Sequence, residues 1–162
     1  MTLAIRDGEP CDAELISELV RDLAAYEKLA RETTSTPEDF RVALANGHCR
    51  VLIAEWEGEA CGFALYFFNF STFLGKRGVY LEDLFVRSKH RGKGVGKALL
   101  ARLARIAKEN DCGRLEWWVL DWNAPSIAFY RSLGAVPMDE WTVYRLAGEA
   151  LDRLAQAGNG SR

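Results

Sequence analysis

The sequence predicts an α/β or α+β fold, a mixed sheet with helices on both faces. Two observations support this prediction. Two strand-type segments are joined by a two-residue turn, and further along the chain strand-type and helix-type segments alternate. The composition is typical of a folded domain, because 49% of the 162 residues are hydrophobic and 27% are charged.

The chain begins with one predicted strand and two predicted helices. Residues 2–6 form the strand, and apolar residues recur at helical spacing after Asp12. The second helix begins at Thr36, a typical N-cap residue, and Pro37 lies in its first turn. The apolar stripe of the first helix consists of Leu15, Ile16, Leu19, Val20 and Leu23.

Three strands are predicted in the middle of the chain. Residues 49–56 and 61–70 are rich in apolar and aromatic side chains typical of strands, and Glu57 and Gly58 form a tight turn between them. Residues 79–87 form the third strand. A hairpin of this kind favours antiparallel pairing in the first part of the sheet.

The second half of the chain alternates between helices and strands. Asn123 is a typical N-cap, and Gly134 is suited to end the helix that Asn123 begins. One domain is expected over residues 1–157, followed by a flexible tail at 158–162. The predicted elements are a helix over 94–109, a strand over 114–120, a helix over 124–133, a strand over 141–146 and a helix over 148–156.

Charge and hydropathy exclude several classes of protein. The chain has 21 Lys and Arg against 23 Asp and Glu, a net charge of −2, which argues against a nucleic-acid or general polyanion-binding protein. The longest apolar run, residues 63–68, is far shorter than the roughly 20 residues of a membrane-spanning helix. Residues 1–9 contain no apolar targeting region, so we expect no signal peptide and no membrane partner.

The cysteines and histidines do not form a metal-binding pattern. The four cysteines, at positions 11, 49, 61 and 112, show no CxxC spacing, and His48 and His90 lie far apart in the sequence. We therefore expect reduced, mostly buried thiols, no bound metal and a cytoplasmic location.

A basic, glycine-rich segment lies between the strand at 79–87 and the helix at 94–109. Its sequence RGKGVGK, at positions 91–97, lacks the first glycine and the hydroxyl of a P-loop and the last glycine of a dinucleotide fingerprint. It fits the pattern [Q/R]xxGx[G/A], which binds the pyrophosphate of acyl-coenzyme A. The candidate cofactor-binding residues here are Arg91, Gly92, Lys93, Gly94, Val95, Gly96 and Lys97.

Several motifs in the same order resemble the GNAT superfamily of acetyl-CoA-dependent N-acetyltransferases. Within that superfamily the chain is most similar to the diamine group, which acetylates spermidine and spermine or thialysine. The matching segments are AYEKL at 25–29, YLED at 80–83, RGKGVG at 91–96, LDWNAPS at 120–126 and FY at 129–130.

The resemblance implies the GNAT fold, with six or seven mostly antiparallel strands. The fourth strand, at 79–87, splays from the fifth, at 114–120. The pantetheine arm of acetyl-CoA then pairs with the main chain of Leu84, Phe85 and Val86. Asn123 and Ser126 are similar to residues that touch the cofactor arm, and plain helix capping is the alternative for Asn123.

The resemblance also implies direct acetyl transfer in a ternary complex. A primary amine has a pKa of roughly 10.4 and must lose a proton before it can attack the thioester. Glu82 corresponds to the base of the family, acting through water, and Tyr130 to the acid that protonates the departing thiolate. The structural alternatives are a charged pair at a strand bulge for Glu82 and a core aromatic for Tyr130.

The expected acceptor is a small primary amine with one remote charge or a zwitterion. The acceptor pocket would include Tyr26, Glu27, Glu82 and Asp83, which suit a cation. The resemblance implies that the polyamine enzymes have an aromatic-Asp-Pro-Trp turn at the position of residues 70–73. This chain has FSTF there. We therefore favour thialysine, a lysine-like amine or a short diamine over a polyamine such as spermidine.

Two further expectations concern partners and rival functions. The resemblance implies a homodimer, in which the apolar strand at 141–146 packs across a two-fold axis and Asp139 completes the acceptor pocket. A non-catalytic acyl-CoA-binding sensor is the rival from another functional class. The presence of both Glu82 and Tyr130 argues against such a sensor.

Overall fold

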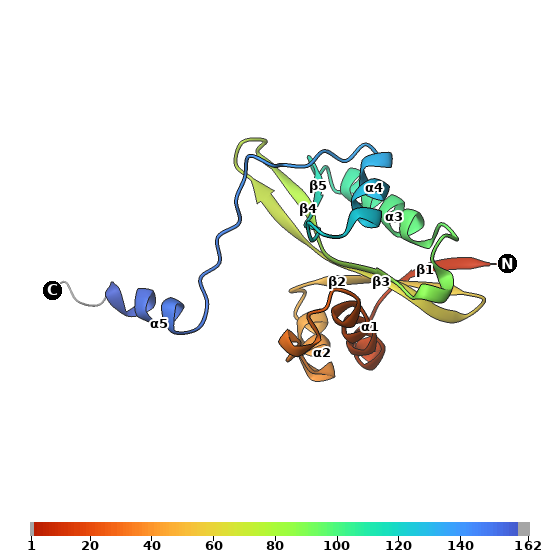
Figure 1. The fold of residues 1–162 in the computed structure, drawn as a ribbon, viewed down its shortest axis with the longest axis horizontal. Coiled ribbons are helices and arrows are strands. Elements are labelled where there is room, and N and C mark those ends of the chain that lie inside the picture. The colour runs from red at the N-terminus through yellow and green to blue at the C-terminus, as the bar shows by residue number, and fades with distance from the viewer. Residues whose placement is uncertain (1, 159–162) are drawn as a thin grey trace. The chain divides into compact units, whose positions relative to one another are not determined.

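The computed structural model describes residues 2–158, and Figure 1 shows its helices and strands. The chain divides into two compact units, residues 1–120 and 121–162, and each unit is described by itself. Gly158 is the C-cap of the last helix, and the rest of the tail expected at 158–162 lies outside the described residues.

The first unit is built on one mixed sheet of five strands in the order β1-β2-β3-β4-β5. The first four pair antiparallel with their neighbours, and β5 pairs parallel with β4. The mixed sheet is confirmed, although it has fewer strands than the six or seven expected. The strands are β1 (Leu3–Asp7), β2 (Arg50–Trp56), β3 (Glu59–Ser71), β4 (Lys76–Val86) and β5 (Leu115–Trp117).

Helices cover both faces of this sheet, as the sequence predicts (Figure 1). Helices α1 (Ala13–Tyr26) and α2 (Pro37–Ala45) lie on one face, and α3 (Val95–Glu109) lies on the other. The predicted cap of α2 is confirmed, because the Thr36 side chain accepts a hydrogen bond from the Asp39 amide. Three short 3-10 helices are η1 (Pro10–Asp12), η2 (Ala30–Glu32) and η3 (Ser88–His90).

The core on the α1 face combines the apolar stripe of α1 with inward-facing residues of the sheet. Leu15 and Val20 lie at its partly buried margin. Alternation along the strands sends the intervening residues, such as Leu52 and Tyr66, to the α3 face. The buried cluster on the α1 face consists of Ile16, Leu19, Leu23, Val51, Ile53, Phe63, Leu65 and Phe85.

The second unit contains two helices joined by an extended segment. Helices α4 (Ala124–Ser132) and α5 (Gly148–Ala157) match the predicted helices at 124–133 and 148–156. The prediction of a strand at 141–146 is wrong, because these residues form no strand in the structure. A strand needs a hydrogen-bonded partner, so strand-forming residues alone do not make one.

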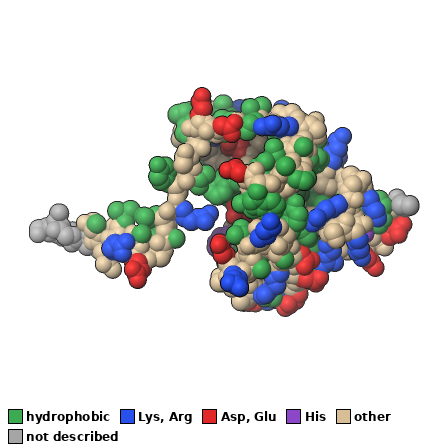
Figure 2. Space-filling model, in the orientation of Figure 1, with side chains coloured by type: hydrophobic (Ala, Val, Ile, Leu, Met, Phe, Trp, Pro, Cys, Tyr) green, Lys and Arg blue, Asp and Glu red, His purple; other side chains and the backbone are tan. Residues whose placement is uncertain are grey.

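The segment between α4 and α5 exposes large apolar side chains. The exposed fraction is 75% for Val136, 71% for Trp141 and 91% for Tyr144. Figure 2 shows hydrophobic side chains on the surface along this segment and along α5. Such exposure over consecutive residues is unusual for a monomeric protein.

None of the described helices is both long and apolar enough to cross a membrane.

Candidate active site

The loop between β4 and α3 presents a row of unused backbone amides. Ala98 N–H donates to Gly94 O at 3.0 Å, and this is the first such bond of α3. Ahead of it, the amides of residues 92–97 donate to no acceptor in the described part of the chain. Gly92 and Gly94 have φ angles of 75° and 80°, and a Cβ at either position would enter open space. The amides are thus available to an anionic ligand at the positive end of the α3 dipole.

Arg91 anchors this loop to the rest of the first unit. Its Nε donates to Val86 O at 2.9 Å. Its guanidinium carbon lies 4.6 Å from the centre of the Tyr26 ring and 5.5 Å from that of Phe85. The predicted cofactor-binding residue Arg91 therefore stacks on α1 and β4, and its structural contribution is to position the loop.

The two lysines of the loop differ from Arg91 in their surroundings. The Lys93 ammonium lies 4.9 Å from the centre of the Trp56 ring, at the end of β2. Lys97 is exposed in the first turn of α3. Trp56 is a site residue that sequence reasoning missed, because nothing local in the sequence places the end of β2 beside this loop.

The predicted splay between the fourth and fifth strands corresponds to a short parallel pairing. The register of β4 and β5 runs from the Val79–Leu115 pair to the Leu81–Trp117 pair and stops there. Strand β5 ends at Trp117, although the sequence predicts a strand to residue 120. The edge of β4 beyond Leu81 therefore has no strand partner on the β5 side within the described residues.

Alternate residues of β4 direct their main-chain groups toward this open edge. Arg87 N–H donates to Cys61 O at 2.8 Å, which sets the phase of the β3–β4 ladder. Because bonded and non-bonded pairs alternate, Phe85 bonds to β3, whereas Leu84 and Val86 point their N–H and C=O groups outward. An extended amide-bearing ligand can pair with such an edge as an added strand. The main chain of Phe85 is bonded to β3, and Val86 O already accepts from Arg91 Nε. The open groups are therefore those of Leu84 and the N–H of Val86.

A β-bulge places two carboxylates of β4 on the same face of the sheet. Leu65 lies opposite Asp83 and Tyr66 lies opposite Leu81, so Glu82 is an extra residue of β4. Leu65 belongs to the core on the α1 face, and Asp83 faces the same way as its cross-strand partner. Leu81 faces α3 together with Tyr66, so alternation turns Glu82 toward α1 as well.

Glu27 joins these two residues in what we call the carboxylate cluster: Glu27, Glu82 and Asp83. Burial, and after it the negative charges of Glu82 and Glu27, raise the pKa of Asp83 to about 7. Burial also raises the pKa of Glu27, which follows the last residue of α1. Tyr26 lies beside the cluster, with its ring centroid 6.5 Å from that of Phe85. The structure thus brings the predicted acceptor residues of the first unit together.

The remaining predicted site residues lie in the second unit. Asn123 caps α4, because its Oδ1 accepts a hydrogen bond from the Ser126 amide at 3.4 Å. The capping alternative for Asn123 is therefore present in the structure. Tyr130 is half-buried in α4, and its ring centroid lies 5.6 Å from that of Phe129. Asp139 is exposed in the segment between α4 and α5.

Ser71, in the turn that distinguishes this chain from the polyamine enzymes, has a local structural role. Its hydroxyl accepts a hydrogen bond from the Leu74 amide at 3.2 Å, and the side chain is buried. Ser71 pairs with Lys76 at the far end of the β3–β4 hairpin. At the rise of a β-strand, that end is about 20 Å from Asp83. Within one chain, Ser71 does not contact an acceptor held at the carboxylate cluster.

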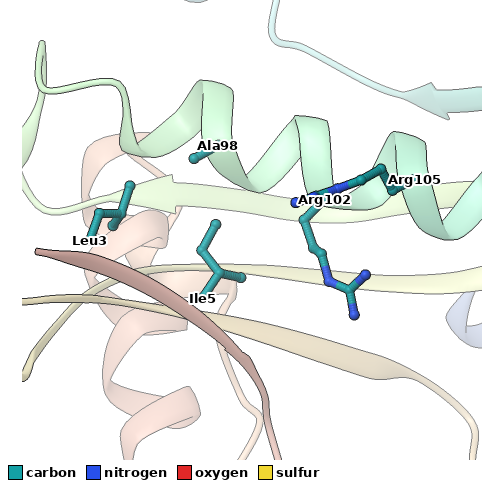
Figure 3. Close-up of a pocket in the computed structure, with 5 residues that line it drawn as sticks. All are labelled: Leu3, Ile5, Ala98, Arg102 and Arg105. Carbon is teal, nitrogen blue, oxygen red and sulfur yellow. The ribbon is translucent and has the colours of Figure 1, made fainter.

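A groove of about 370 Å³ lies elsewhere, between β1 and α3 (Figure 3). Arg102 and Arg105 extend from α3, and Leu3 and Ile5 come from β1. Strand β1 is the opposite edge of the sheet from β5, and α3 covers the opposite face from the carboxylate cluster. This groove is therefore separate from the candidate active site.

The first unit thus combines three features that suit one reaction. A row of free amides can hold a pyrophosphate, and an open strand edge can hold an extended amide-bearing arm. The carboxylate cluster attracts a cation and offers acceptors for a proton. The residues present therefore fit a nucleotide-linked acyl donor together with a cationic acceptor.

Comparisons with known proteins identify a matching family and several relatives. The model of the acetyltransferase (GNAT) family matches residues 16–135. Thialysine N-epsilon-acetyltransferase of Bos taurus is 35% identical over 167 residues, covering 93% of this chain and 96% of that protein. L-ornithine N5-acetyltransferase of Arabidopsis thaliana is 46% identical over 93 residues, covering 57% of this chain and 41% of that protein.

A solved structure shares the fold over nearly the whole length. The integron cassette protein from the mobile metagenome of V. cholerae superposes with a TM-score of 0.80 and is 28% identical. The match covers 96% of this chain and 99% of that one.

Proposed function

Because the chain belongs to the GNAT family of acetyltransferases, we propose that it acetylates a primary amine of a small cationic or zwitterionic acceptor. Thialysine, a lysine-like amine or a short diamine fits this description. The acetyl group passes directly from acetyl-CoA to the amine in a ternary complex. The observation that carries the proposal is the carboxylate cluster, which lies next to the open edge of β4.

Acetyl-CoA supplies an activated acetyl thioester, and the residues of the first unit would hold it in two places. The amides of residues 92–97 would bind the pyrophosphate, with Lys93 and Lys97 nearby in the sequence. Leu84, through its N–H and C=O, and Val86, through its N–H, would pair with the pantetheine arm. Asn123 and Ser126 are assigned to the cofactor arm by resemblance, in addition to their capping contact.

The resemblance assigns the catalytic roles to the carboxylate cluster and to Tyr130. The negative charges of the carboxylate cluster hold the ammonium group of the acceptor. A carboxylate of the cluster then accepts its proton, and the resemblance assigns this second role to Glu82. Tyr130 donates a proton to the coenzyme A thiolate as the carbon–sulfur bond breaks. The similarity to enzymes that acetylate thialysine and ornithine supports a short amino-acid acceptor.

Domain organisation and location form part of the same proposal. We assign residues 1–157 to one domain, which the family match supports because it crosses the boundary between the two units. The four free cysteines support a reducing, cytoplasmic location.

A screen of acetyl-CoA consumption tests the proposed acceptor class. The wild-type enzyme would be offered thialysine, lysine, ornithine, putrescine, spermidine and a histone-like peptide, each at the same low concentration. We expect the amino acids to be consumed fastest. Faster turnover of spermidine would favour a polyamine enzyme, and faster turnover of the peptide would point to a protein substrate. Binding of acetyl-CoA with no turnover of any amine would favour the sensor.

We also propose that two copies associate through the segment between α4 and α5. The exposed Val136, Trp141 and Tyr144 support this, because a second copy would remove apolar surface from water. The same association would bring Asp139, and with it Glu140, to the partner's acceptor pocket.

Sedimentation tests this association at micromolar concentration. We expect a species of twice the chain mass of 18.2 kDa for the wild type. The variant Trp141→Glu should sediment as a monomer, whereas Trp118→Glu, which changes an exposed tryptophan outside this segment, should remain a dimer. A monomeric wild type would refute the proposal.

A further inference from the structure

Asp83 and Glu82 differ in their surroundings although they are neighbours in β4. Glu82 is the extra residue of the bulge and is exposed to solvent. Asp83 pairs with Leu65, a residue of the core on the α1 face, and is half-buried. Burial disfavours the charged form of a carboxyl group, and neighbouring negative charges disfavour it further.

The charged groups around Asp83 come from three elements. Glu82 is on the same strand, and Glu27 approaches from the end of α1. Arg91 lies over Tyr26 and Phe85, next along the same face, where its Nε is bonded to Val86 O. Tyr80, on the same face, is affected by the same carboxylates, since burial and then Glu82 contribute to raising its pKa to about 12.

We propose that Asp83, rather than Glu82, accepts the proton that the bound ammonium group must lose. This inference deepens the proposed function and rests on it. Three observations support it: the position of Asp83 on the acceptor face, its pairing with the core residue Leu65, and its place immediately before Leu84. The outward main-chain groups of Leu84 bring the expected acyl donor to the same part of β4.

The local charges also suit the role. Burial and the neighbouring carboxylates raise the pKa of Asp83 to about 7, and a general base works best when its pKa is close to the working pH. When a cationic acceptor enters, its charge stabilises the ionised form of Asp83, which is the form that accepts a proton. Glu27 and Glu82 then hold the acceptor while Asp83 deprotonates it.

The proton and electron count of the reaction is balanced. One proton moves from the ammonium nitrogen to the Asp83 carboxylate, which leaves a neutral amine. The nitrogen lone pair forms a bond to the acetyl carbon, and the carbon–sulfur bond breaks with its electron pair on sulfur. The thiolate gains one proton as the new amide nitrogen loses its second. Asp83 then releases its proton to water, so one proton is produced per turnover.

Two measurements test the assignment of Asp83 as the base, and only the second requires enzyme activity. Carbon-13 NMR of the aspartate side chains would follow the carboxyl titration in the unliganded protein, with Asp83→Asn to identify the signal. We expect Asp83 to titrate near pH 7 and to shift to lower pH in Glu82→Gln, because a neighbouring negative charge is removed. Titration of Asp83 near pH 4 would overturn the proposal, whether or not the enzyme acetylates an amine.

The pH dependence of kcat/KM provides the second measurement. We expect an acidic limb near pH 7 in the wild type, and a loss of about 100-fold at pH 7 in Asp83→Asn that is partly recovered at pH 9.5. Glu82→Gln should move the limb to lower pH and raise KM for the amine. Asp7→Asn, at an exposed position of β1, is the matched control and should change neither.

The outcomes distinguish a wrong choice of base from a wrong proposed function. If Glu82→Gln removes the acidic limb and Asp83→Asn retains it, Glu82 is the base and Asp83 is not. If the wild type turns over none of the amines, the proposed function is wrong, and the carboxyl titration still reports whether Asp83 holds a proton at neutral pH.

Discussion

Glu82 and Asp83 are consecutive residues whose side chains lie on the same face of the sheet. In a regular strand they would point to opposite faces, and one carboxylate would lie under α3. The bulge opposite the Leu65–Tyr66 step changes this, and it does so next to the end of the β4–β5 pairing. One irregularity in the hairpin therefore creates a local concentration of negative charge beside an open strand edge.

The loop glycines are the first target for mutation. Gly94→Asp should abolish stabilisation by coenzyme A, because it adds a negative charge and a side chain where the pyrophosphate would bind. Gly47→Asp is the matched control, since Gly47 has a φ of 70° and open space around its Cβ, at the end of α2. A thermal-shift titration with coenzyme A measures both. Equal stabilisation of the two variants would exclude the loop as the binding site.

The proposed role of Tyr130 as a proton donor predicts that replacing it affects turnover more than cofactor binding. Tyr130→Phe removes one hydroxyl and keeps the ring that packs near Phe129 in α4. We expect kcat to fall by about 100-fold while the dissociation constant of coenzyme A stays the same. Steady-state kinetics and calorimetry would measure the two quantities. Phe129→Leu, a neighbouring change that keeps the hydroxyl of Tyr130, should retain most of kcat.

The raised pKa of Asp83 predicts an unusual dependence of stability on pH. Between about pH 4 and pH 7 the folded protein holds a proton that the unfolded chain has released. The free energy of unfolding should therefore fall as the pH rises through this range and level off above it. Asp83→Asn removes the effect, so it should be more stable than the wild type by about 2 kcal/mol at pH 8. Urea unfolding at pH 4 and pH 8 measures this difference.

The same experiment contains its own check. At pH 4 the side chain is neutral in both proteins, so their free energies of unfolding should agree. A wild type whose stability rises between pH 4 and pH 7 would contradict the assigned direction of the pKa shift.

Gly62 is required by the close approach of β3 and β4. A Cβ at this position would lie 2.6 Å from Phe85 O, a backbone atom that cannot rotate away. Gly62→Ala should therefore lower the free energy of unfolding by about 2 kcal/mol. Gly158→Ala, where the added Cβ meets nothing within 4 Å, should have little effect. Similar thermal midpoints for the two variants would show that β4 shifts without strain.

The sequence predicts best those features that depend on near neighbours. Thr36 and Asn123 cap their helices as predicted, because a cap is decided within four residues. The turn at Glu57 and Gly58 is confirmed for the same reason, since both residues adopt positive φ angles between β2 and β3. The glycine loop also lies between a strand and a helix, as its motif requires.

Features that depend on distant partners could not be predicted from the sequence. The apolar run at 114–120 gives a strand of three residues, because β4 offers partners only at residues 79–81. The strand-type segment at 141–146 forms no strand among the described residues. The bulge at Glu82 is a property of the register with Leu65 and Tyr66, which lie far away in the sequence. The stacking of Arg91 on Tyr26 has the same origin.

The order of the strands has a consequence for how the protein folds. Strands β2, β3 and β4 follow one another with short turns, so their contacts close small loops and lose little chain entropy. Strand β5 follows α3 in the chain, so its pairing with β4 closes a longer loop. That pairing forms only three residue pairs. The edge of β4 should therefore be formed in the folding transition state before β5 has docked. Substitutions in the β3–β4 hairpin should slow folding, and substitutions in β5 should instead speed unfolding.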